Sequence, residues 1–406
     1  MSRFLSAVCL AQVVFLLSVF CGFAGAQGIE LAPADGESLD ATTPRVANLP
    51  KEENVETPAE QEVESPSDAA PLAAEREIDV ELREEIRRCL TVYFEKRLNT
   101  RDRSPWAIMH SLISYGVETD VDMGAPGGQR VNAIGWLCYN QPSAGQQIFY
   151  LSNGKMQTRQ GPGVEGHKGQ FLAMLAQSKV KTDYPIRIEN REFTVADLID
   201  YEKRTCEPRS ELTFKLIALS HYLDSNATWQ SERGENWDIP RLISEELAQP
   251  IVGAACGGTH RMTGFSYAVR NRVKQGGEVE GEWLRAQKYV DSYIEYTYKL
   301  QNPDGSFSTN WFEGMGPTGT KDRKIQTTGH ILEWLVYSLP EEDLTDPRVV
   351  KAVRFISGTM LANENHSWEI GPRGHALHAL AIYDERVFGS RPGSRKYLIA
   401  TRQSGE

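Results

Sequence analysis

Four histidines occupy comparable places in the chain, each directly preceded by Gly or Thr and followed by a mostly apolar segment. They are His167, His260, His330 and His375. We expect each one to lie at the start of a buried helix, where the positive end of the helix lowers the pKa of the imidazole. An imidazole that is neutral at pH 7 can act as a general base or as a metal ligand. The pattern predicts a histidine-rich site, and the simpler alternative is that each histidine only packs against its own turn.

Other polar and aromatic residues accompany these histidines. Glu211 takes the corresponding place in another segment, where a helix start favours a carboxylate. Arg261 follows His260 and Arg373 precedes His375, so both cations are expected to flank one rim. The simpler alternatives are that Glu211 is only a first-turn acid of a helix, that the two arginines are solvated surface residues, and that the tryptophans only fill the core. The candidate catalytic residues are His260, His330, His375, His167 and Glu211, and the candidate substrate-binding residues are Arg261, Arg373, Trp334 and Trp368.

A thiol and an imidazole share one helical face at Cys256-x3-His260, with His330 as a third candidate ligand. A zinc site normally uses three or four such groups, and the sequence shows no clear fourth. We therefore predict no metal site, and the sequence identifies no cofactor.

The segment 281–339 shows which elements position these residues. Apolar and aromatic residues between Leu284 and Leu300 recur at helical spacing, as on one amphipathic helix. Asn302-Pro303-Asp304-Gly305 then ends this helix and turns the chain. A second helix is expected to begin near Thr327, and it must be buried because it is apolar almost all round. The unit is an outer helix, a turn and an inner helix.

This unit recurs along the chain. Inner-helix starts are expected at Trp106, His167, Glu211, His260, His330 and His375, at spacings of 61, 44, 49, 70 and 45 residues. The fold class is therefore all-α, and we expect an (α/α)6 toroid of six inner and about six outer helices. An open solenoid is the alternative, although solenoid repeats are usually shorter. Asn153-Gly154 between two alternating segments predicts a β-hairpin near 148–158.

The two C-terminal units resemble the repeats of the terpenoid cyclase and protein prenyltransferase superfamily, including squalene cyclase-type repeats. Arg285-Ala286, Tyr289-Val290, Gln301, Asp304-Gly305-Ser306 and Phe307 follow the order of that repeat, with a longer spacer and with Phe in place of Trp. Lys351-Ala352, Phe355-Ile356 and Ser367-Trp368 repeat it without the Gln and Gly. The resemblance implies the toroid fold. The Asp-rich motif of the cyclases and the Asp that accompanies the prenyltransferase Cys are missing, so the chemistry is not implied.

The N-terminal region differs in composition from the rest of the chain. Residues 1–26 have the layout of a secretory signal peptide, with a basic start, an apolar run and Ala24-Gly25-Ala26 as a cleavage site. An uncleaved membrane anchor is the alternative. Residues 27–74 form an acidic, Pro-rich stretch that we expect to be a disordered linker. We expect the toroid domain to occupy 75–406 and the protein to be exported, periplasmic or extracellular, and monomeric.

Charge and cysteine content narrow the function classes. The net charge of the chain is −11, and most of it lies in the linker, so the folded part is nearly balanced and no nucleic-acid partner is expected. Cys89, Cys138, Cys206 and Cys256 either form two disulfides, in any of three pairings, or stay unpaired. One hypothesis is an exported enzyme acting on an anionic polysaccharide or a polyprenyl-type lipid. The other is a binding module whose concave surface takes a peptide, glycan or lipid.

Overall fold

The computed structural model of the chain describes residues 79–389, so the expected signal peptide and linker lie outside the described residues. Twelve α-helices dominate this range, and its strands form only two-stranded sheets. The prediction of an all-α class is confirmed. None of the helices in this range combines the length and the apolar character needed to cross a bilayer.

Six helices, the even-numbered ones, are buried along most of their length. Every residue from Thr327 to Val336 of α10 is buried, as is every residue from Thr213 to Ser220 of α6. Such helices are apolar on all sides and can only be stable inside the molecule. Their bounds are α2 (Pro105–Tyr115), α4 (Gln170–Gln177), α6 (Thr213–Tyr222), α8 (Thr259–Lys274), α10 (Lys321–Ser338) and α12 (Ile370–Phe388).

The even-numbered helices contact one another in chain order. α2 packs against α4, α4 against α6, α6 against α8, α8 against α10 and α10 against α12. α12 in turn packs against α2, the first of the series. Each even-numbered helix therefore has two even-numbered neighbours.

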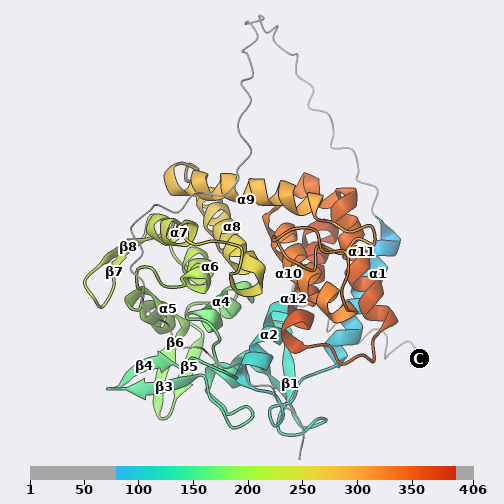
Figure 1. Cartoon of the computed structure of the whole chain (residues 1–406). Helices are drawn as coiled ribbons and strands as arrows, with labels where there is room; N and C mark the ends of the chain where they lie inside the picture. The colour runs from blue at the N-terminus through green and yellow to red at the C-terminus, as the bar shows by residue number, and fades with distance from the viewer. Residues whose placement is uncertain (1–78, 390–406) are drawn as a thin grey trace, which may run out of the picture. The chain divides into compact units, whose positions relative to one another are not determined.

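The odd-numbered helices lie outside this set (Figure 1) and bury one face only. In α9, for example, Trp283, Ala286, Val290 and Thr297 are buried while most of the intervening residues reach solvent. α1, α9 and α11 are long, whereas α3, α5 and α7 are short. Their bounds are α1 (Val80–Glu95), α3 (Ala133–Cys138), α5 (Val195–Arg204), α7 (Ile239–Leu247), α9 (Gly281–Lys299) and α11 (Pro347–Ala362).

Antiparallel β-hairpins accompany the three short odd-numbered helices. The expected hairpin is confirmed, because β3 and β4 pair through Ser152 and Lys155 with Asn153-Gly154 as the loop. Three further hairpins were not predicted, and each one directly precedes α3, α5 or α7. The strands are β1 (Asp120–Asp122) with β2 (Arg130–Asn132), β3 (Phe149–Ser152) with β4 (Lys155–Thr158), β5 (Pro185–Ile188) with β6 (Arg191–Thr194), and β7 (Thr228–Gln230) with β8 (Asn236–Asp238). Three 3-10 turns complete the elements, at Gly116–Glu118, Ala255–Gly258 and Glu341–Thr345.

Two of the expected helix starts are wrong. α10 begins at Lys321 and not near Thr327, because Thr320 caps the helix by accepting a hydrogen bond from the backbone N–H of Arg323. α12 begins at Ile370, several residues before His375. The charge effect of a helix end fades within the first turn. The positive helix ends therefore do not account for the environment of His330 and His375.

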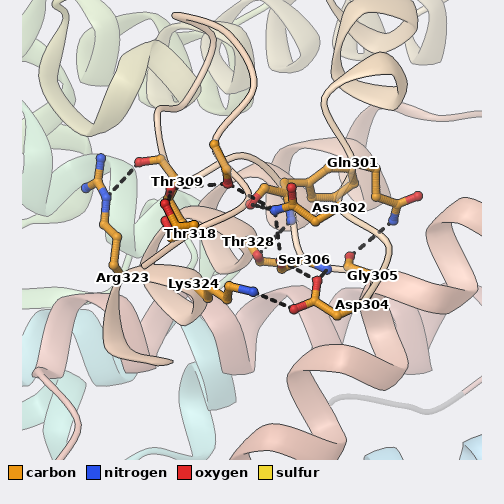
Figure 2. Close-up of polar contacts among 12 residues, drawn as sticks. Gln301, Asn302, Asp304, Gly305, Ser306, Thr309, Thr318, Arg323, Lys324 and Thr328 are labelled. Carbon is orange, nitrogen blue, oxygen red and sulfur yellow. Dashed lines mark hydrogen bonds and ion pairs between the residues drawn. The ribbon is translucent and has the colours of Figure 1, made fainter. Parts of the chain in front are cut away.

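The turn between α9 and α10 ties three helices together (Figure 2). Gln301 follows α9 and donates through Nε2 to the carbonyl of Arg348 in α11 at 2.8 Å. The same group donates to the carbonyl of Gly305 at 3.1 Å (Figure 2). The backbone N–H of Phe307 donates to Thr328 Oγ1 in α10 at 3.0 Å, and Lys324 Nζ lies 2.6 Å from Asp304 Oδ2. The residues that carry the repeat motif thus have a structural role between helices.

Candidate functional site: a histidine cluster among the even-numbered helices

One aromatic ring from, or just before, each even-numbered helix takes part in a continuous series of ring contacts. The ring of His375 (α12) lies 3.9 Å from that of His330 (α10), 4.9 Å from that of His260 (α8) and 5.7 Å from that of His110 (α2), measured between centroids. The series continues from His260 to Phe214 (α6) at 5.1 Å, and from Phe214 to His167, before α4, at 4.9 Å. We call His110, His167, His260, His330 and His375 the histidine cluster. The structure thus brings all four predicted histidines into one series of contacts.

Hydrogen bonds fix the orientation of most of these imidazoles through Nδ1. The Nδ1 of His110 lies 2.6 Å from the carbonyl oxygen of Trp106, and that of His330 lies 2.7 Å from the carbonyl oxygen of Gln326. A carbonyl oxygen can only accept, so Nδ1 must carry the proton in both residues. In a neutral ring the lone pair is then on Nε2, which is the atom free to take a proton or bind a metal ion.

Glu333 provides the same anchoring at the buried end of the cluster. Its Oε2 lies 2.6 Å from Nδ1 of His375, and its Oε1 is hydrogen-bonded to Nδ1 of His378. Burial alone would raise the pKa of this carboxyl, but the two histidines outweigh that effect and hold its pKa well below the usual range. Glu333 is therefore a carboxylate that accepts from both imidazoles.

The cluster differs from the sequence prediction in what keeps its imidazoles neutral. Burial, followed by the neighbouring His375, lowers the pKa of His110 to about 3. The same two causes hold the pKa values of His260 and His330 well below their usual range. Desolvation disfavours the charged imidazolium, and nearby histidines add repulsion. A lowered pKa was predicted for His260 and His330, but its main cause is burial and not the helix end.

Three members of the site reach solvent while the others are buried. His330 and His375 are each only 3% exposed, whereas His260 and Cys256 are half-buried. His167 is also half-buried, and its Nδ1 lies 2.8 Å from Oε2 of Glu211. The side of the cluster formed by Cys256, His260 and His167 is therefore the less buried, more open side.

Cys256, His260 and His330 form the group best suited to a metal ion. Each offers one ligand atom, and the three atoms lie within 4.8 Å of one another. Tetrahedral zinc places sulfur and nitrogen ligands about 3.3–3.8 Å apart, given bonds of about 2.0–2.3 Å. A shift of about 1 Å in the side chains would therefore close the site. These are the same three candidate ligands that the sequence indicated, and no fourth protein ligand joins them in the described range.

The backbone at Cys256 is held in an uncommon conformation. Cys256, Gly257 and Gly258 all have left-handed φ values, at 51°, 64° and 82°. This conformation is unfavourable for a residue with a Cβ, and it persists when the surroundings enforce it, often at functional sites. A Cβ at Gly257 would lie 2.3 Å from Cγ of Trp311, so only glycine lets Trp311 pack there. Trp311 in turn contacts the ring of His330, with 5.5 Å between centroids.

Three predicted substrate-binding residues lie away from the open side. Arg261 is buried and pairs with Glu246 at 2.8 Å, so it stabilises the interior and does not flank a rim. Trp334 is fully buried, and its Nε1 donates to Ser266 Oγ at 3.3 Å. Trp368 is 5% exposed and donates to the hydroxyl of Tyr93 at 2.8 Å. All three have structural partners because charged and polar groups need them when buried.

Arg373, the fourth predicted binding residue, lines a pocket between α1, α2 and α12. His110 and Gly374 line the same pocket, so it borders the histidine cluster. Burial lowers the pKa of the Arg373 guanidinium. Among the four predicted binding residues, Arg373 is thus the one that lines this pocket of the described range.

Sequence reasoning missed several members of the site. His110, Phe214, Glu333 and His378 carry no repeat motif, and Trp311 lies in an irregular segment. The spacing i, i+3 could have indicated two of them, because His330 with Glu333 and His375 with His378 each share one helical face. The pairing of those two faces depends on the packing of α10 against α12, which no local pattern specifies.

Comparisons with known proteins identified no relative of this chain. No family model, no curated protein and no solved structure matches the chain. The resemblance to terpenoid cyclase and prenyltransferase repeats therefore stays a prediction.

Proposed function

We propose that residues 79–389 form an (α/α)6 toroid whose centre is the active site of an exported, metal-dependent enzyme. The contacts of the even-numbered helices in chain order, with α12 against α2, support the toroid. The series of rings that draws one residue from each of these helices supports a site at its centre. Export is inferred from the layout of residues 1–26.

One observation carries the metal-dependent function. Cys256, His260 and His330 bring one thiol and two imidazoles within 4.8 Å, and Cys256 is half-buried. Thiolate with imidazole is a donor set that suits zinc, and the Nδ1 bond of His330 to a carbonyl is the usual outer contact of a zinc-binding histidine. Catalytic zinc sites typically use three protein ligands and keep one position open.

The metal ion and the residues around this triad would have separate roles in the reaction. A bound metal ion would act as a Lewis acid and would orient a water molecule or a substrate oxygen. Glu333 fixes the tautomer of His375, so Nε2 of His375 presents its lone pair beside His330 and His260 and can accept a proton. Trp311 and Phe214 pack beside the imidazoles and keep bulk water away from them.

The substrate class follows from the charges and the predicted location. An exported enzyme meets cell-surface polymers and lipids, and the proposed substrates are an anionic polysaccharide or a polyprenyl-type lipid. Both carry anionic groups, in keeping with the basic pocket at Arg373. A metal-assisted hydrolysis or an elimination next to the anionic group fits a site with one Lewis acid and one base.

A binding module is the second candidate, favoured by the burial of the cluster. His110, His330 and His375 are each only 3% exposed, so rings fill this part of the molecule. In that case the cluster would be structural, and a peptide, glycan or lipid would bind on the surface above it.

Metal content and turnover, measured on the same samples, test the proposed function. The full chain is purified without a polyhistidine tag, and its zinc content is determined by mass spectrometry. We expect about one zinc ion per chain, a loss of zinc in Cys256→Ser and His330→Ala, and no loss in His366→Ala. His366 is a suitable control because it is paired with Asp322 at 2.8 Å and belongs to neither the triad nor the cluster.

Turnover is then screened with oligouronides and with polyprenyl pyrophosphates. We expect activity on one class, with kcat reduced by about 10²–10⁴-fold in His375→Ala, as for loss of a proton-transfer group. A chain that holds no zinc and turns over neither class, while still binding one of them, would contradict the enzyme and support the binding module.

A further inference from the structure

The pocket at Arg373 contains a concentration of positive charge. It is lined by Lys96, Arg97 and Arg130 as well as Arg373, together with the aromatic side chains Tyr93 and Tyr115. Asp120 is the one carboxylate in the lining. The walls come from the end of α1, the middle of α2, the first hairpin and the start of α12.

Three of these cations already have partners in the protein. Arg97 Nε lies 2.8 Å from Asp122 Oδ1, Arg130 Nε lies 3.9 Å from Asp120 Oδ2, and Lys96 donates to the carbonyl of Glu364. Arg373 is different, because its guanidinium has no hydrogen-bond or ion-pair partner among residues 79–389. Arg373 is therefore the cation of the pocket that has neither an ion pair nor a side-chain hydrogen bond within this range.

An unpaired guanidinium in a partly buried position is energetically unfavourable. Arginine stays charged in proteins, so it cannot avoid the cost by losing its proton. A buried charge is normally retained only when something compensates it. The planar fork of donors matches the two oxygens of a carboxylate or a phosphate. A small anionic group in this pocket would supply the compensation that the protein itself does not.

We infer that this pocket is an anion subsite in which Arg373 binds the carboxylate or phosphate group of the substrate. This inference deepens the proposed function and rests on it only in calling the bound anion part of a substrate. The binding of an anion does not itself depend on that function. His110 lines the pocket and its ring lies 5.7 Å from that of His375, so the bound group would be one imidazole away from the cluster. Arg373 and His375 lie on the same helix, which fixes the distance between the two sites.

Thermal unfolding of the full chain in the presence of simple anions tests this subsite. The probes are inorganic phosphate and galacturonate, with chloride at equal ionic strength as the reference. A ligand that binds only the folded state raises Tm in a concentration-dependent manner. We expect one of the two probes to raise Tm, and the probe that does so identifies the phosphate or the carboxylate as the anionic group.

Two variants make the test specific. Arg373→Met keeps the bulk of the stem and removes the donors, so the anion-dependent rise in Tm should disappear and the Kd should weaken by about tenfold or more. Without anion, this variant should be at least as stable as the parent, because an unpaired charge is gone. Arg285→Met removes an exposed cation on α9 that does not line the pocket, and it should behave as the parent does.

The outcomes separate this inference from the proposed function. A Tm that neither probe raises, or an equal rise in Arg373→Met and the parent, would overturn the anion subsite whatever the zinc content is. An anion effect that depends on Arg373 in a chain without zinc or turnover would support the subsite and contradict the enzyme.

Discussion

At the scale of single residues, the chemistry depends on what each buried polar group touches. A carbonyl or a carboxylate accepts a hydrogen bond from Nδ1 of His110, His330 and His375. This bond fixes the tautomer and leaves Nε2 as the reactive nitrogen. A histidine with no such partner can rotate and exchange tautomers, and its reactive nitrogen is then not defined. The orientation of this cluster is therefore built into the folded chain before any ligand arrives.

A second buried carboxyl, Glu165, has a different environment from Glu333. It accepts hydrogen bonds from the backbone N–H of Phe171 at 2.7 Å and from Gln160 Nε2 at 2.5 Å, but it forms no ion pair within residues 79–389. Burial, and then the negative charge of Glu202, raise its pKa from the ordinary 4.5 to about 8. The folded protein thus retains a proton between pH 4.5 and pH 8 that the unfolded chain has released.

The free energy of unfolding should therefore depend on pH through this proton. Because the folded state binds it more tightly, the contribution of Glu165 is fully present below about pH 4.5 and is lost as the pH rises to about 8. The slope approaches about 1.4 kcal/mol per pH unit. In Glu165→Gln this dependence should be absent, so the free energy of unfolding of the variant relative to the parent should rise by about 2 kcal/mol between pH 5.5 and 7.5.

Urea denaturation of both proteins at the two pH values measures the effect. Glu95→Gln, on the exposed end of α1, is the matched control and should not change with pH relative to the parent. A difference between Glu165→Gln and the parent that is constant with pH would show that Glu165 is ionised in the folded state.

At the scale of elements, the turn between α9 and α10 determines how three helices meet. Gly305 has φ +94°, and a Cβ at this position would lie 2.5 Å from the carbonyl oxygen of Lys351 in α11. The substitution Gly305→Ala should therefore combine backbone strain with a clash against the backbone, and should destabilise the fold by about 2 kcal/mol or more.

The control for this substitution separates strain from clash. Gly276 also has positive φ, at +74°, but nothing lies within 4 Å of the site of its Cβ. Gly276→Ala should cost only the strain of about 1 kcal/mol. Equal losses of unfolding free energy in the two variants, measured by denaturation, would mean that the contact with α11 is not tight.

The sequence predicted those elements that are specified locally. The buried even-numbered helices followed from continuous apolar runs, and the β3–β4 hairpin followed from Asn153-Gly154. Thr194-x-x-Asp197 is likewise a local signature of a helix start, and the structure shows this capping box at α5.

The elements that were missed lack such local signals. The β5–β6 hairpin turns at Glu189-Asn190, where Glu189 adopts φ +55°, although glutamate is not a residue that favours this conformation. β7 and β8 have only three residues each. The first turns of α10 were missed because Lys321-Asp322-Arg323-Lys324 is entirely charged and gives no apolar period.

The candidate site was predictable only in part, for the same reason. His167, His260, His330, His375 and Glu211 were found because they recur before or within apolar runs. Arg261 was misassigned, because only the structure shows that Glu246 lies within 2.8 Å of it. The cysteine alternatives could not be separated by sequence either, and the structure has all four thiols of the described range unpaired.

At the scale of the whole molecule, the described fold should be independent of the N-terminal region. Residues 27–74 are acidic and Pro-rich, with too little apolar surface to offset the entropy of ordering. A chain that begins at Glu75 should therefore keep the Tm of the mature protein to within about 2 °C. Differential scanning calorimetry of the two chains is the measurement, and a much lower Tm for the shorter one would show that the linker contributes to the fold.

The central claim is that the histidines of the even-numbered helices form one cluster whose Nε2 atoms are held ready for chemistry. Histidine-selective 15N NMR tests it directly, because two-bond proton–nitrogen correlations distinguish the two neutral tautomers. At pH 7 we predict that His110, His330 and His375 all carry the proton on Nδ1, as their carbonyl and carboxylate partners require. His330 and His375 with the proton on Nε2, or exchanging freely between tautomers, would contradict the claim.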